Sequence, residues 1–534
     1  MTVTQPKILD NKLYLYLTEF FAGMSVMAVE LGASRLLAPY FSSSQIVWTI
    51  IIGTIMIAMA LGNVYGGRSA DKNPDPDRLY RRLMIAAVWI AAIPVLGKYI
   101  ILLISGALVL TISNNFLILA AFLSCMIVFV FPLFLLGTVT PSLVKYTVSS
   151  LDEGGKVVGN LGAFNTVGSI IGTFLPTFVT IPAVGTAVTF LIFSGVLLVL
   201  GLLYFISARR RPVLCVVSVI LFVICTIFGH TGSFAFWEKN LRYEGESIYN
   251  YLQVKETDRS VILSTNVLFG VQSVYQKEPG LTGMYYDYAL AAPVMAGAEQ
   301  GDRDVLILGM GTGTFAAQTE RYFPGNRISG VEIDQKITDL ARTHFALAEE
   351  IPVTTYDGRA YLAGDKNTYD VIMVDAYQDI TIPFQMSSVE FFTMVRDHLK
   401  PGGVMVVNMN MHSEEPGNIN EHLADTICAV FPWAATVDVP GATNRELFAA
   451  AEDCTPRLDR ALETLPEGEL RDLMLQVRTN LRSYEPGGYL LTDDRAPVEL
   501  LGMSVIDGLI SRELGYYQDL FRERGISGFL NELS

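Results

Sequence analysis

Three acidic residues in the second half of the chain each lie at or just beyond the end of a short apolar run. Glu332 ends "RISGVE", Asp375 ends "YDVIMVD", and Asp357 begins "DGRAYL" after a third run. An acid at the end of the second strand of a nucleotide-binding fold is placed to accept hydrogen bonds from two ribose hydroxyls. We therefore expect Glu332 to bind a ribose and Asp357 to hold an adenine amino group.

A glycine-rich turn precedes these acids. The stretch "DVLILGMGTGTF" places Gly309, Gly311 and Gly313 between an apolar run and a segment expected to be helical from about Phe315. Bare backbone amides and a helix N-terminus favour electron-rich groups. Because the glycines lie in a strand–turn–helix–strand–acid context, they indicate a nucleotide-binding loop, and Gly358 is a further expected cofactor contact.

The spacing of the glycines bears on which nucleotide binds. A dinucleotide-binding loop reads G-x-G-x-x-G, and its pyrophosphate lies at the helix N-terminus. Here the third glycine position is Thr314 and the run is G-x-G-x-G. A single adenosine sulfonium brings no pyrophosphate, so the pattern favours an S-adenosyl-type ligand over NAD.

The elements that position these residues alternate between apolar runs and helical segments. This order predicts a Rossmann-like α/β fold with a doubly wound parallel sheet, whose ligand site lies at the carboxyl ends of the strands. Gly309, Glu332, Asp357 and Asp375 all fall at that edge. We assign this domain to residues 297–454, followed by a C-terminal helical segment over 455–534.

The first half of the chain has a different composition. The whole chain is 51% hydrophobic and 17% charged; residues 1–229 hold 14 basic and 8 acidic residues, and the remainder holds 24 and 45. Several uncharged runs approach the ~20 residues that a helix needs to cross a bilayer. We predict a multi-pass α-helical membrane domain over residues 1–230, with the lipid bilayer as its partner. Its helices, about seven in number, are expected near 14–40, 45–67, 83–109, 114–142, 158–181, 184–207 and 213–229.

Basic residues gather in alternate loops of this domain, at 68–82, at 145–156 and at 209–211. Loops rich in Lys and Arg normally face the cytoplasm, which with one more helix would place the acidic domain outside the cell. Nucleotide-type cosubstrates are an intracellular resource and argue for the cytoplasm. We predict a multi-pass protein of the cell membrane and leave the side of its soluble domain open.

Several motifs along nearly the whole chain resemble those of one family. They are "ELGASRLLAPYFSSS", "GGRSAD" and "NTVGSIIGTFLP" in the first half, and "ESIYNYLQV", "GVQSVY", "YYDYAL", the glycine loop with "VEID", "DGRAYL" and "VDAY" in the second. With these the chain resembles the spermidine synthases, or polyamine aminopropyltransferases, and specifically their membrane-fused bacterial relatives. The resemblance implies a small β-rich lead-in, about 241–278, within residues 231–296.

The resemblance also implies an activity and a set of site residues. The donor would be decarboxylated S-adenosylmethionine and the acceptor a small polycationic amine such as putrescine. Glu332 would bind the ribose, Asp357 the adenine side, and Gln272 and Tyr286 would line the pocket. Asp375 stands where the family has its proton acceptor, because an amine must lose a proton before it attacks the carbon next to the sulfonium.

The chain departs from the family pattern mainly where the amine would bind. The glycine loop carries Thr312 in place of an acid, and a Tyr-His pair is replaced by Tyr286 and Asp287. A second acid after the fourth strand is replaced by Gln378, and a glutamine of the lead-in by Asn250. We list Asn250, Gln272, Tyr286, Asp287 and Gln378 as candidate substrate-binding residues. Asp287 is expected to restore one amine-binding carboxylate.

Three functions stay open on the sequence. The first is aminopropyl transfer; the second is a membrane-bound methyltransferase that uses intact S-adenosylmethionine, which Thr312 favours because an acid there would repel the donor's carboxylate. The third is a non-catalytic nucleoside or polyamine sensor or transporter. We expect no metal, because the histidines lack ligand spacing, and no nucleic acid, because no basic stripe with interleaved aromatics exists. The oligomeric state is not readable.

Overall fold

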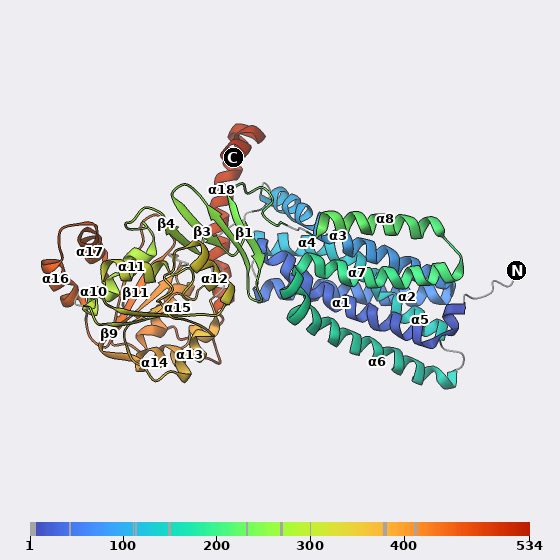
Figure 1. Cartoon of the computed structure of the whole chain (residues 1–534), viewed down its shortest axis with the longest axis horizontal. Helices are drawn as coiled ribbons and strands as arrows, with labels where there is room; N and C mark the ends of the chain where they lie inside the picture. Colours follow the sequence, from blue (N-terminus) through green and yellow to red (C-terminus); the bar gives the residue numbers. More distant parts are fainter. Residues whose placement is uncertain are drawn as a thin grey trace. The chain divides into compact units, whose positions relative to one another are not determined.

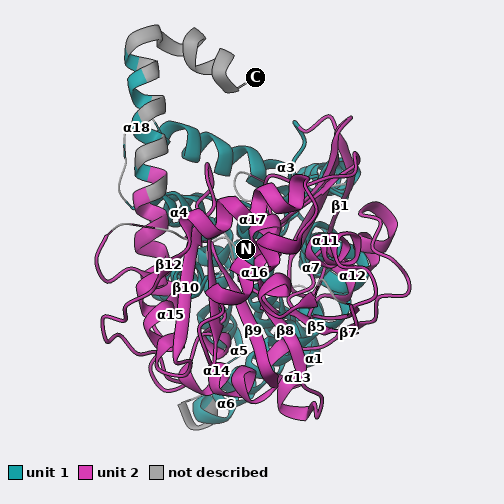
Figure 2. Ribbon diagram, turned by 90° about the vertical axis from the view of Figure 1, so that its left-hand side faces the viewer, with its two compact units in different colours: residues 1–237, 511–534 teal, residues 238–510 magenta. Residues whose placement is uncertain are grey.

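The computed structural model describes all residues except 1–6, 42–43, 110–111, 113–114, 148–150, 231–232, 268–270, 299–300, 378–381, 411–412, 414 and 534. The chain divides into two compact units (Figure 2). Unit 1 comprises Met1–Trp237 with Ser511–Ser534, and unit 2 comprises Glu238–Ile510.

Unit 1 consists of long helices (Figure 1). Among the described residues, six helical stretches are long and apolar enough to cross a membrane. One of them, Gly154–Ala208, contains a kink at Gly185, whose φ of 79° and ψ of 168° are not helical. The predicted apolar segments fall within these helical stretches, apart from residue 114, which lies outside the described residues, and Asn115, which precedes α4. The helices are α1 (Lys12–Phe41), α2 (Gln45–Lys72), α3 (Pro76–Val109), α4 (Phe116–Gly137), α5 (Val139–Thr147), α6 (Leu151–Leu175), η2 (Pro176–Thr180), α7 (Ile181–Ala208), α8 (Pro212–Gly229) and part of α18 (Val498–Leu533).

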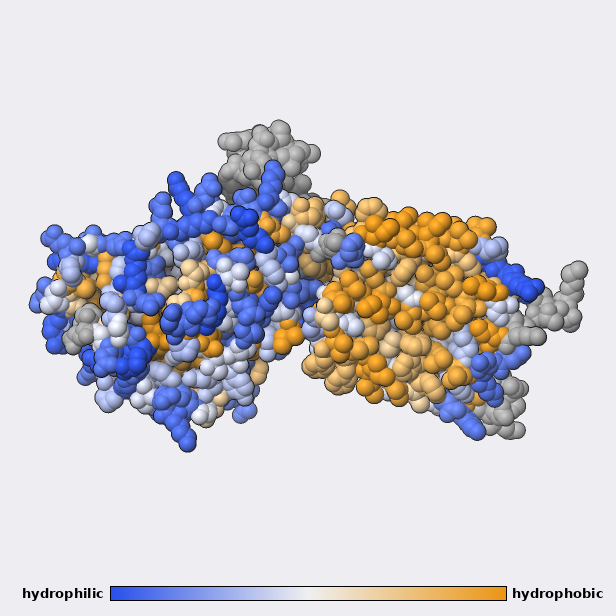
Figure 3. All heavy atoms as spheres, viewed as in Figure 1, coloured by the Kyte–Doolittle hydropathy of each residue, from blue (hydrophilic) through white to orange (hydrophobic). Residues whose placement is uncertain are grey.

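The outer surface of these helices is apolar over a broad area (Figure 3). Exposed side chains include Met56 on α2, Leu103 on α3 and Phe228 on α8, all more than 60% exposed. An exposed apolar surface of this kind is unfavourable in water and typical of protein that contacts lipid. The composition of unit 1 thus agrees with a membrane-embedded domain.

Small residues bring α1 and α6 into close contact. A Cβ atom added at Gly168 would overlap the carbonyl oxygen of Phe20, and one added at Gly172 would overlap that of Met24. The two backbones therefore approach more closely than any larger residue permits, as the four-residue spacing of these glycines predicts.

Contacts within unit 1 place the basic loops at one end of the helices. Lys145 Nζ lies 3.0 Å from Asp71, and the Arg210 guanidinium lies 3.2 Å from Asp77. The turns that follow α2, α5 and α7 therefore share one end. Since α8 begins at Pro212 beside this end, the chain leaves the helices at the opposite end, after Gly229.

Unit 2 begins with a four-stranded antiparallel sheet inside the predicted lead-in. Its strands are β1 (Leu241–Glu246), β2 (Tyr251–Glu256), β3 (Ser260–Ser264) and β4 (Ser273–Gln276), in the order β1-β2-β3-β4. Apolar residues on one face, including Leu252 and Leu263, pack against Ile337 and Leu340 of α12 (Gln335–His344). Because alternate strand residues point to opposite faces, one apolar face suffices to pack this sheet against α12.

The larger sheet has eight strands in the order β12-β10-β11-β9-β8-β5-β6-β7. The five strands predicted from apolar runs are parallel: β5 (Asp304–Leu308), β6 (Arg327–Glu332), β7 (Val353–Thr355), β8 (Tyr369–Val374) and β9 (Leu399–Met409). Residues that alternate along the central strands, such as Ile307 and Leu308, are buried on both faces, as a doubly wound sheet requires.

Three further strands extend the sheet, each paired antiparallel to its neighbours, so the prediction of a purely parallel sheet was incomplete. They are β10 (Trp433–Asp438), β11 (Arg445–Ala450) and β12 (Arg482–Ser483). The short connection between β10 and β11 permits only an antiparallel pair, since a parallel crossover needs about a dozen residues or more. The predicted helical segment 455–534 accordingly contributes a strand as well as helices.

Helices cover both faces of this sheet. Residues of α9 (Tyr285–Ala289), α10 (Ala291–Met295), α11 (Thr314–Tyr322), α16 (Thr455–Thr464) and α17 (Glu469–Asn480) share one apolar core with Val305, Val371, Val406 and Phe448 of the strands. The remaining helices are α13 (Gly358–Gly364), α14 (Val389–Asp397) and α15 (Ile419–Cys428). A buried side chain of this kind contributes about 1.5–3 kcal/mol to stability.

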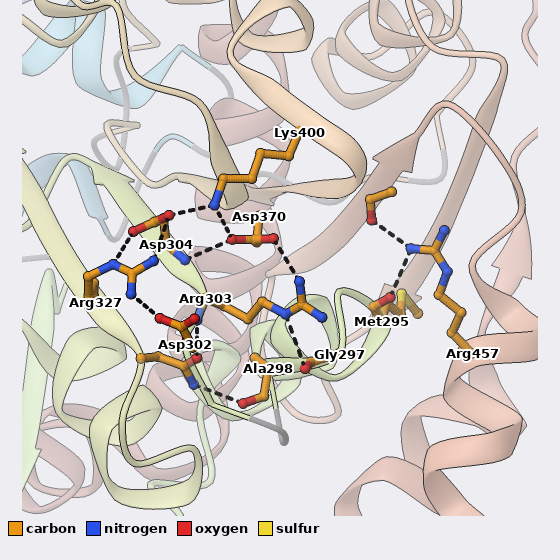
Figure 4. Close-up of polar contacts among 12 residues, drawn as sticks. Met295, Gly297, Ala298, Asp302, Arg303, Asp304, Arg327, Asp370, Lys400 and Arg457 are labelled. Atoms are coloured by element: carbon orange, nitrogen blue, oxygen red, sulfur yellow. Dashed lines mark hydrogen bonds and ion pairs between the residues drawn. The ribbon is translucent and has the colours of Figure 1, made fainter.

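An ion-pair network joins the amino ends of the central strands (Figure 4). Asp304, the first residue of β5, binds Arg327 at 2.6 Å and Lys400 at 2.5 Å. Asp370 of β8 binds Lys400 at 2.7 Å and Arg303 at 3.3 Å, and it accepts a hydrogen bond from the Asp304 amide at 2.8 Å. The network fixes the register of β5, β6 and β8 at the edge opposite to the candidate site.

Candidate active site

The candidate site lies where the strand order of the large sheet reverses. β5 has β6 on one side and β8 on the other, so the loops after β5 and β8 leave the sheet in different directions. Ligands of open α/β sheets bind at this switch point, at the carboxyl ends of the strands. Gly309 follows β5 and Asp375 follows β8, and therefore both stand at this point.

Gly309 allows the two loops to touch. The Asp375 amide donates to the Leu308 carbonyl at 2.8 Å, and a Cβ atom at position 309 would lie 2.5 Å from the Asp375 carbonyl oxygen. Gly309 also has a φ of 90°, which a side chain disfavours. This glycine is thus required for the glycine loop to lie against the residue that we predicted to be catalytic.

Glu332 is tied to the glycine loop. Its Oε2 accepts from the Gly311 amide at 2.9 Å, and its Oε1 accepts from the Asp334 amide at 3.0 Å. Burial raises the pKa of the Glu332 carboxyl to about 7, against the lowering effect of these amides. The structure therefore brings the predicted ribose acceptor to the glycine turn, with each carboxylate oxygen oriented by a backbone donor.

The lead-in contacts the site at two points, at Asp334 after β6 and at Thr314, where α11 begins. Asn250 Nδ2 and Ser247 Oγ donate to Asp334 Oδ2 at 3.1 and 2.5 Å. The Thr314 hydroxyl donates to the Val274 carbonyl of β4 at 3.0 Å. The buried Asn250 side chain thus supports the residue that caps α12, and its predicted contact with substrate stays a prediction.

Asp375 is held by two side chains from different elements. Its Oδ2 accepts from the Tyr285 hydroxyl of α9 at 2.8 Å, and its Oδ1 accepts from Asn408 Nδ2 of β9 at 2.8 Å. The Asn408 oxygen in turn accepts from Asn444 Nδ2 at 2.8 Å, so its amide nitrogen faces Asp375. Burial, with a smaller contribution from the charge of Glu332, raises the pKa of the Asp375 carboxyl to about 7, against the lowering effect of the bonds from Asn408 and Tyr285.

Sequence analysis identified Asp375 but not the residues that hold it. Asn408 follows an apolar run at the end of the fifth parallel strand, which is the same signal that singled out Asp375. Tyr285 precedes a tyrosine that was already a candidate. The sequence could therefore have indicated Asn408, whereas the choice between neighbouring tyrosines depended on the turn into α9.

Tyr286 and Gln272 lie together through a backbone contact, and their predicted place in the pocket lining stays a prediction. The Tyr286 hydroxyl donates to the Gln272 carbonyl at 3.0 Å and lies 3.3 Å from Ser273 Oγ. The rings of Tyr285 and Tyr286 are adjacent, with centroids 3.9 Å apart. Tyr286 thus joins α9 to the start of β4, while its neighbour Tyr285 reaches Asp375.

Asp357 and Gly358 form the start of α13 after β7. Asp357 Oδ1 accepts from the Ala360 amide at 2.8 Å and caps the helix. Gly358 lies near the site's floor, where an added Cβ would be 3.7 Å from Leu308 of β5. The cap places the half-buried Asp357 at the predicted edge, and its contact with adenine stays a prediction.

Asp287 holds the turn that precedes α9. Its Oδ1 accepts from the amide and hydroxyl of Thr282 at 3.1 and 3.0 Å, and its Oδ2 accepts from the Gly283 amide at 2.6 Å. The buried carboxylate therefore stabilises the turn that begins α9, and its predicted contact with an amine stays a prediction. Gln378 lies outside the described residues.

The site combines two carboxyls with different surroundings. Glu332, at the end of β6, accepts hydrogen bonds from backbone amides beside the glycine loop. Asp375, after β8, accepts hydrogen bonds from the side chains of Tyr285 and Asn408. A carboxyl whose pKa lies near 7 exchanges protons readily at neutral pH and fits general acid–base work. The geometry suits a nucleoside bound at the glycine loop and a proton acceptor at Asp375.

Comparisons with known proteins bear on this geometry. The family model described as "Spermine/spermidine synthase domain" matches residues 286–447. The chain is 55% identical over 347 residues to a probable polyamine aminopropyl transferase of Bifidobacterium longum, covering 62% of this chain and 77% of that protein. It is 24% identical over 295 residues to a polyamine aminopropyltransferase of Vibrio vulnificus, covering 52% of this chain and 96% of that one. A solved structure titled as a probable spermidine synthase of Corynebacterium glutamicum matches with 18% identity and a TM-score of 0.37, over 46% of this chain and 96% of that chain.

Proposed function

This chain belongs to the spermidine synthase family of polyamine aminopropyltransferases, and from this premise we propose that it transfers an aminopropyl group from decarboxylated S-adenosylmethionine to a polyamine such as putrescine. One observation carries the proposal. Asp375 lies against the glycine loop with both oxygens oriented, by Tyr285 and by Asn408. A positioned carboxylate at the edge of a nucleoside site is what deprotonation of an amine requires.

Asp375 would act on the acceptor. The carboxylate attracts the ammonium of the polyamine and accepts one of its protons. The freed nitrogen lone pair then forms a bond to the aminopropyl carbon, while the carbon–sulfur bond breaks and its electron pair stays on sulfur. The products are a secondary ammonium, the neutral thioether methylthioadenosine and a protonated Asp375, so charge and protons balance.

Glu332 and the glycine loop would hold the donor. The Glu332 oxygens each accept one backbone hydrogen bond and have capacity for another from a ribose hydroxyl. Asp357 and Gly358 would contact the adenine. Holding donor and acceptor in one geometry removes much of the entropic cost of a two-substrate reaction, and this is the main service of such a site.

Thr312 supports a second candidate function. This residue is buried, its hydroxyl lies 3.3 Å from that of Thr314, and it puts no carboxylate at this point of the loop. A loop without that acid does not repel the carboxylate of intact S-adenosylmethionine, so methyl transfer is the alternative activity. The two activities leave different nucleoside products.

Mass spectrometry of the products distinguishes these activities. The full chain in detergent is incubated with putrescine and with either decarboxylated or intact S-adenosylmethionine. We expect methylthioadenosine and an aminopropylated amine from the decarboxylated donor only. S-Adenosylhomocysteine from the intact donor would instead identify a methyltransferase, and binding without either product would identify a sensor or transporter.

We further propose that unit 1 lies in the cell membrane as a multi-pass domain. Its apolar helices and their exposed apolar surface support this placement. The basic end of the helices and the point where the chain leaves them are at opposite ends, so the loop-charge rule and the intracellular cosubstrate still favour opposite sides for unit 2. Protease protection of unit 2 in oriented vesicles decides between them.

A further inference from the structure

A buried acid that the proposed mechanism does not use lies beside the catalytic carboxyl. Glu446, in β11, is directly opposite Asn408 of β9 in the sheet register. Opposed residues of neighbouring strands point to the same face, so Glu446 shares the face on which Asn408 contacts Asp375. Asp375, Asn408 and Glu446 thus form a row across β8, β9 and β11.

This row continues the polar cluster of the site. α9, which supplies Tyr285, packs on both β9 and β11 and therefore covers the row. Asn444, two residues before Glu446 and on the same face, donates to Asn408 and is partly exposed. The cluster thus extends from the partly exposed Asp375 and Asn444 to the fully buried Glu446.

Glu446 differs from the other buried acids in its hydrogen bonding. Its side chain is 0% exposed, and neither carboxylate oxygen has a hydrogen-bond partner among the described residues. Asp425, which is equally buried, accepts from the Tyr484 hydroxyl and from the amides of Gly487 and Tyr489 at 2.7–2.9 Å. The fold therefore supplies donors for one buried acid and none for the other.

An acid without donors in this position is unfavourable for the unliganded fold. Each buried polar group left unpaired costs about 1–3 kcal/mol, and more when it is charged. Burial raises the pKa of the Glu446 carboxyl well above its usual range, and the charge of Asp375 adds to this effect. Such a residue is explained when a ligand supplies the missing donors.

We infer that Glu446 binds the distal ammonium of an α,ω-diamine whose other nitrogen is at Asp375, and that it thereby selects diamines over monoamines. The inference rests on the proposed aminopropyl transfer. An ammonium would supply three hydrogen-bond donors and a positive charge to the Glu446 carboxylate, which has no donors among the described residues of the fold. Neighbouring strands lie about 4.8 Å apart, so two strand spacings, roughly 10 Å, separate the backbones of Asp375 and Glu446. This separation suits a short aliphatic chain with an amine at each end.

In the part of the site that would bind the amine, the family's acids are replaced by Thr312 and Gln378. Glu446 would supply a carboxylate in their place. Asp287 accepts hydrogen bonds from Thr282 and Gly283 in the turn before α9, so its oxygens are already engaged by the protein. Asp375 and Glu446 together give one carboxylate for each end of the substrate. The amine-binding part of the site would thus take a carboxylate from β11, a strand that the sequence pattern did not indicate.

Binding calorimetry on the full chain in detergent, saturated with methylthioadenosine, tests the inference without turnover. The titrants are putrescine and butylamine, which have the same carbon chain and differ by one amine. We expect wild type to favour putrescine, and Glu446→Gln to weaken putrescine binding by about 10- to 100-fold while leaving butylamine binding within about twofold. Equal weakening of both amines, or no change in putrescine binding, would overturn the inference.

Two further variants separate binding from folding. Asp425→Asn alters an equally buried acid far from the row in sequence and bonding; it is expected to lower the thermal stability and to leave the putrescine-to-butylamine ratio unchanged. Glu446→Asp keeps the charge but withdraws it by one methylene, so the preferred diamine should become one carbon longer; an unchanged length preference would contradict the assignment. Turnover of wild type tests the proposed function separately, so either idea can fail alone.

Discussion

Replacing Tyr285 by phenylalanine removes one of the two hydrogen bonds that stabilise the ionised form of Asp375. The Tyr285 hydroxyl donates to Asp375 Oδ2 at 2.8 Å, and the Asn408 bond remains in the variant. Because the lost bond favours the carboxylate, its removal raises the pKa of Asp375. A general base works only when ionised, so the acidic limb of the activity profile should move to higher pH.

The size of this shift follows from the strength of the bond. A hydrogen bond to a charged group contributes about 1.5–3 kcal/mol, and Asp375 is partly exposed, which favours the lower end. One pKa unit corresponds to about 1.4 kcal/mol, so the expected shift is about one unit. Starting from a pKa of about 7, the limb should move to about 8. At neutral pH the ionised fraction falls from about one half to about one tenth, which lowers kcat/KM about fivefold.

The assay is kcat/KM for the amine at saturating donor, measured from about pH 6 to about pH 9, because this parameter reports the free enzyme. The control is Tyr288→Phe, which removes a hydroxyl from the same helix, and no described hydrogen bond joins that hydroxyl to Asp375. An acidic limb that stays in place in Tyr285→Phe, or moves to lower pH, would refute the assignment of Asp375 as the base, whether or not the activity falls equally at every pH.

Other substitutions test the remaining parts of the site and fold. Asp375→Asn should abolish turnover because the proton acceptor is lost, yet leave methylthioadenosine binding within a few-fold by calorimetry; retained turnover would place the base elsewhere. Glu332→Ala should weaken binding of the same nucleoside by about 10- to 100-fold, since charge-assisted bonds to the ribose disappear, and unchanged affinity would mean that the ribose lies elsewhere. Gly168→Ala should lower the thermal unfolding temperature in detergent, because the added methyl meets the Phe20 carbonyl of α1, whereas Gly154→Ala, with open space around it, should not. If both alanine variants melt alike, the close α1–α6 contact is not present in solution.

The sequence predicted those parts of unit 2 that follow from local pattern. Central parallel strands such as β5 and β8 are short apolar runs, and the residue that ends a strand falls at the carboxyl edge of the sheet because parallel strands share their direction. Gly309, Glu332 and Asp375 could therefore be placed together without a structure. A different local pattern, the four-residue spacing of Gly168 and Gly172, predicts the close helix packing in unit 1.

The antiparallel strands were missed for a physical reason. β11 reads "RELFAA". Because its second residue is acidic, the sequence resembles a surface segment, although every residue after Arg445 is buried. Its direction and neighbours are set by pairing with β9, a contact across nearly forty residues that no local pattern reports. The unusual burial of Glu446, on which the inference about diamines depends, was invisible for the same reason.

The partners of Asp375 and Asp287 illustrate the same limit. The family resemblance suggested that the acid next to Tyr286 could bind an amine, and the structure shows this carboxylate accepting hydrogen bonds from the turn at Thr282 and Gly283. Whether an acid faces a ligand or a nearby amide depends on a few backbone angles. The chemistry of the side chains at the strand ends could thus be predicted from the sequence. The direction in which side chains point within loops could not.

The most direct test of this account is a structure of the full chain with methylthioadenosine and putrescine bound. We predict that the ribose hydroxyls lie within hydrogen-bond distance of Glu332 and that one putrescine nitrogen lies within the same distance of Asp375. A nucleoside bound away from the β5 loop, or an amine that contacts neither Asp375 nor its neighbours on β9 and β11, would contradict the proposed chemistry.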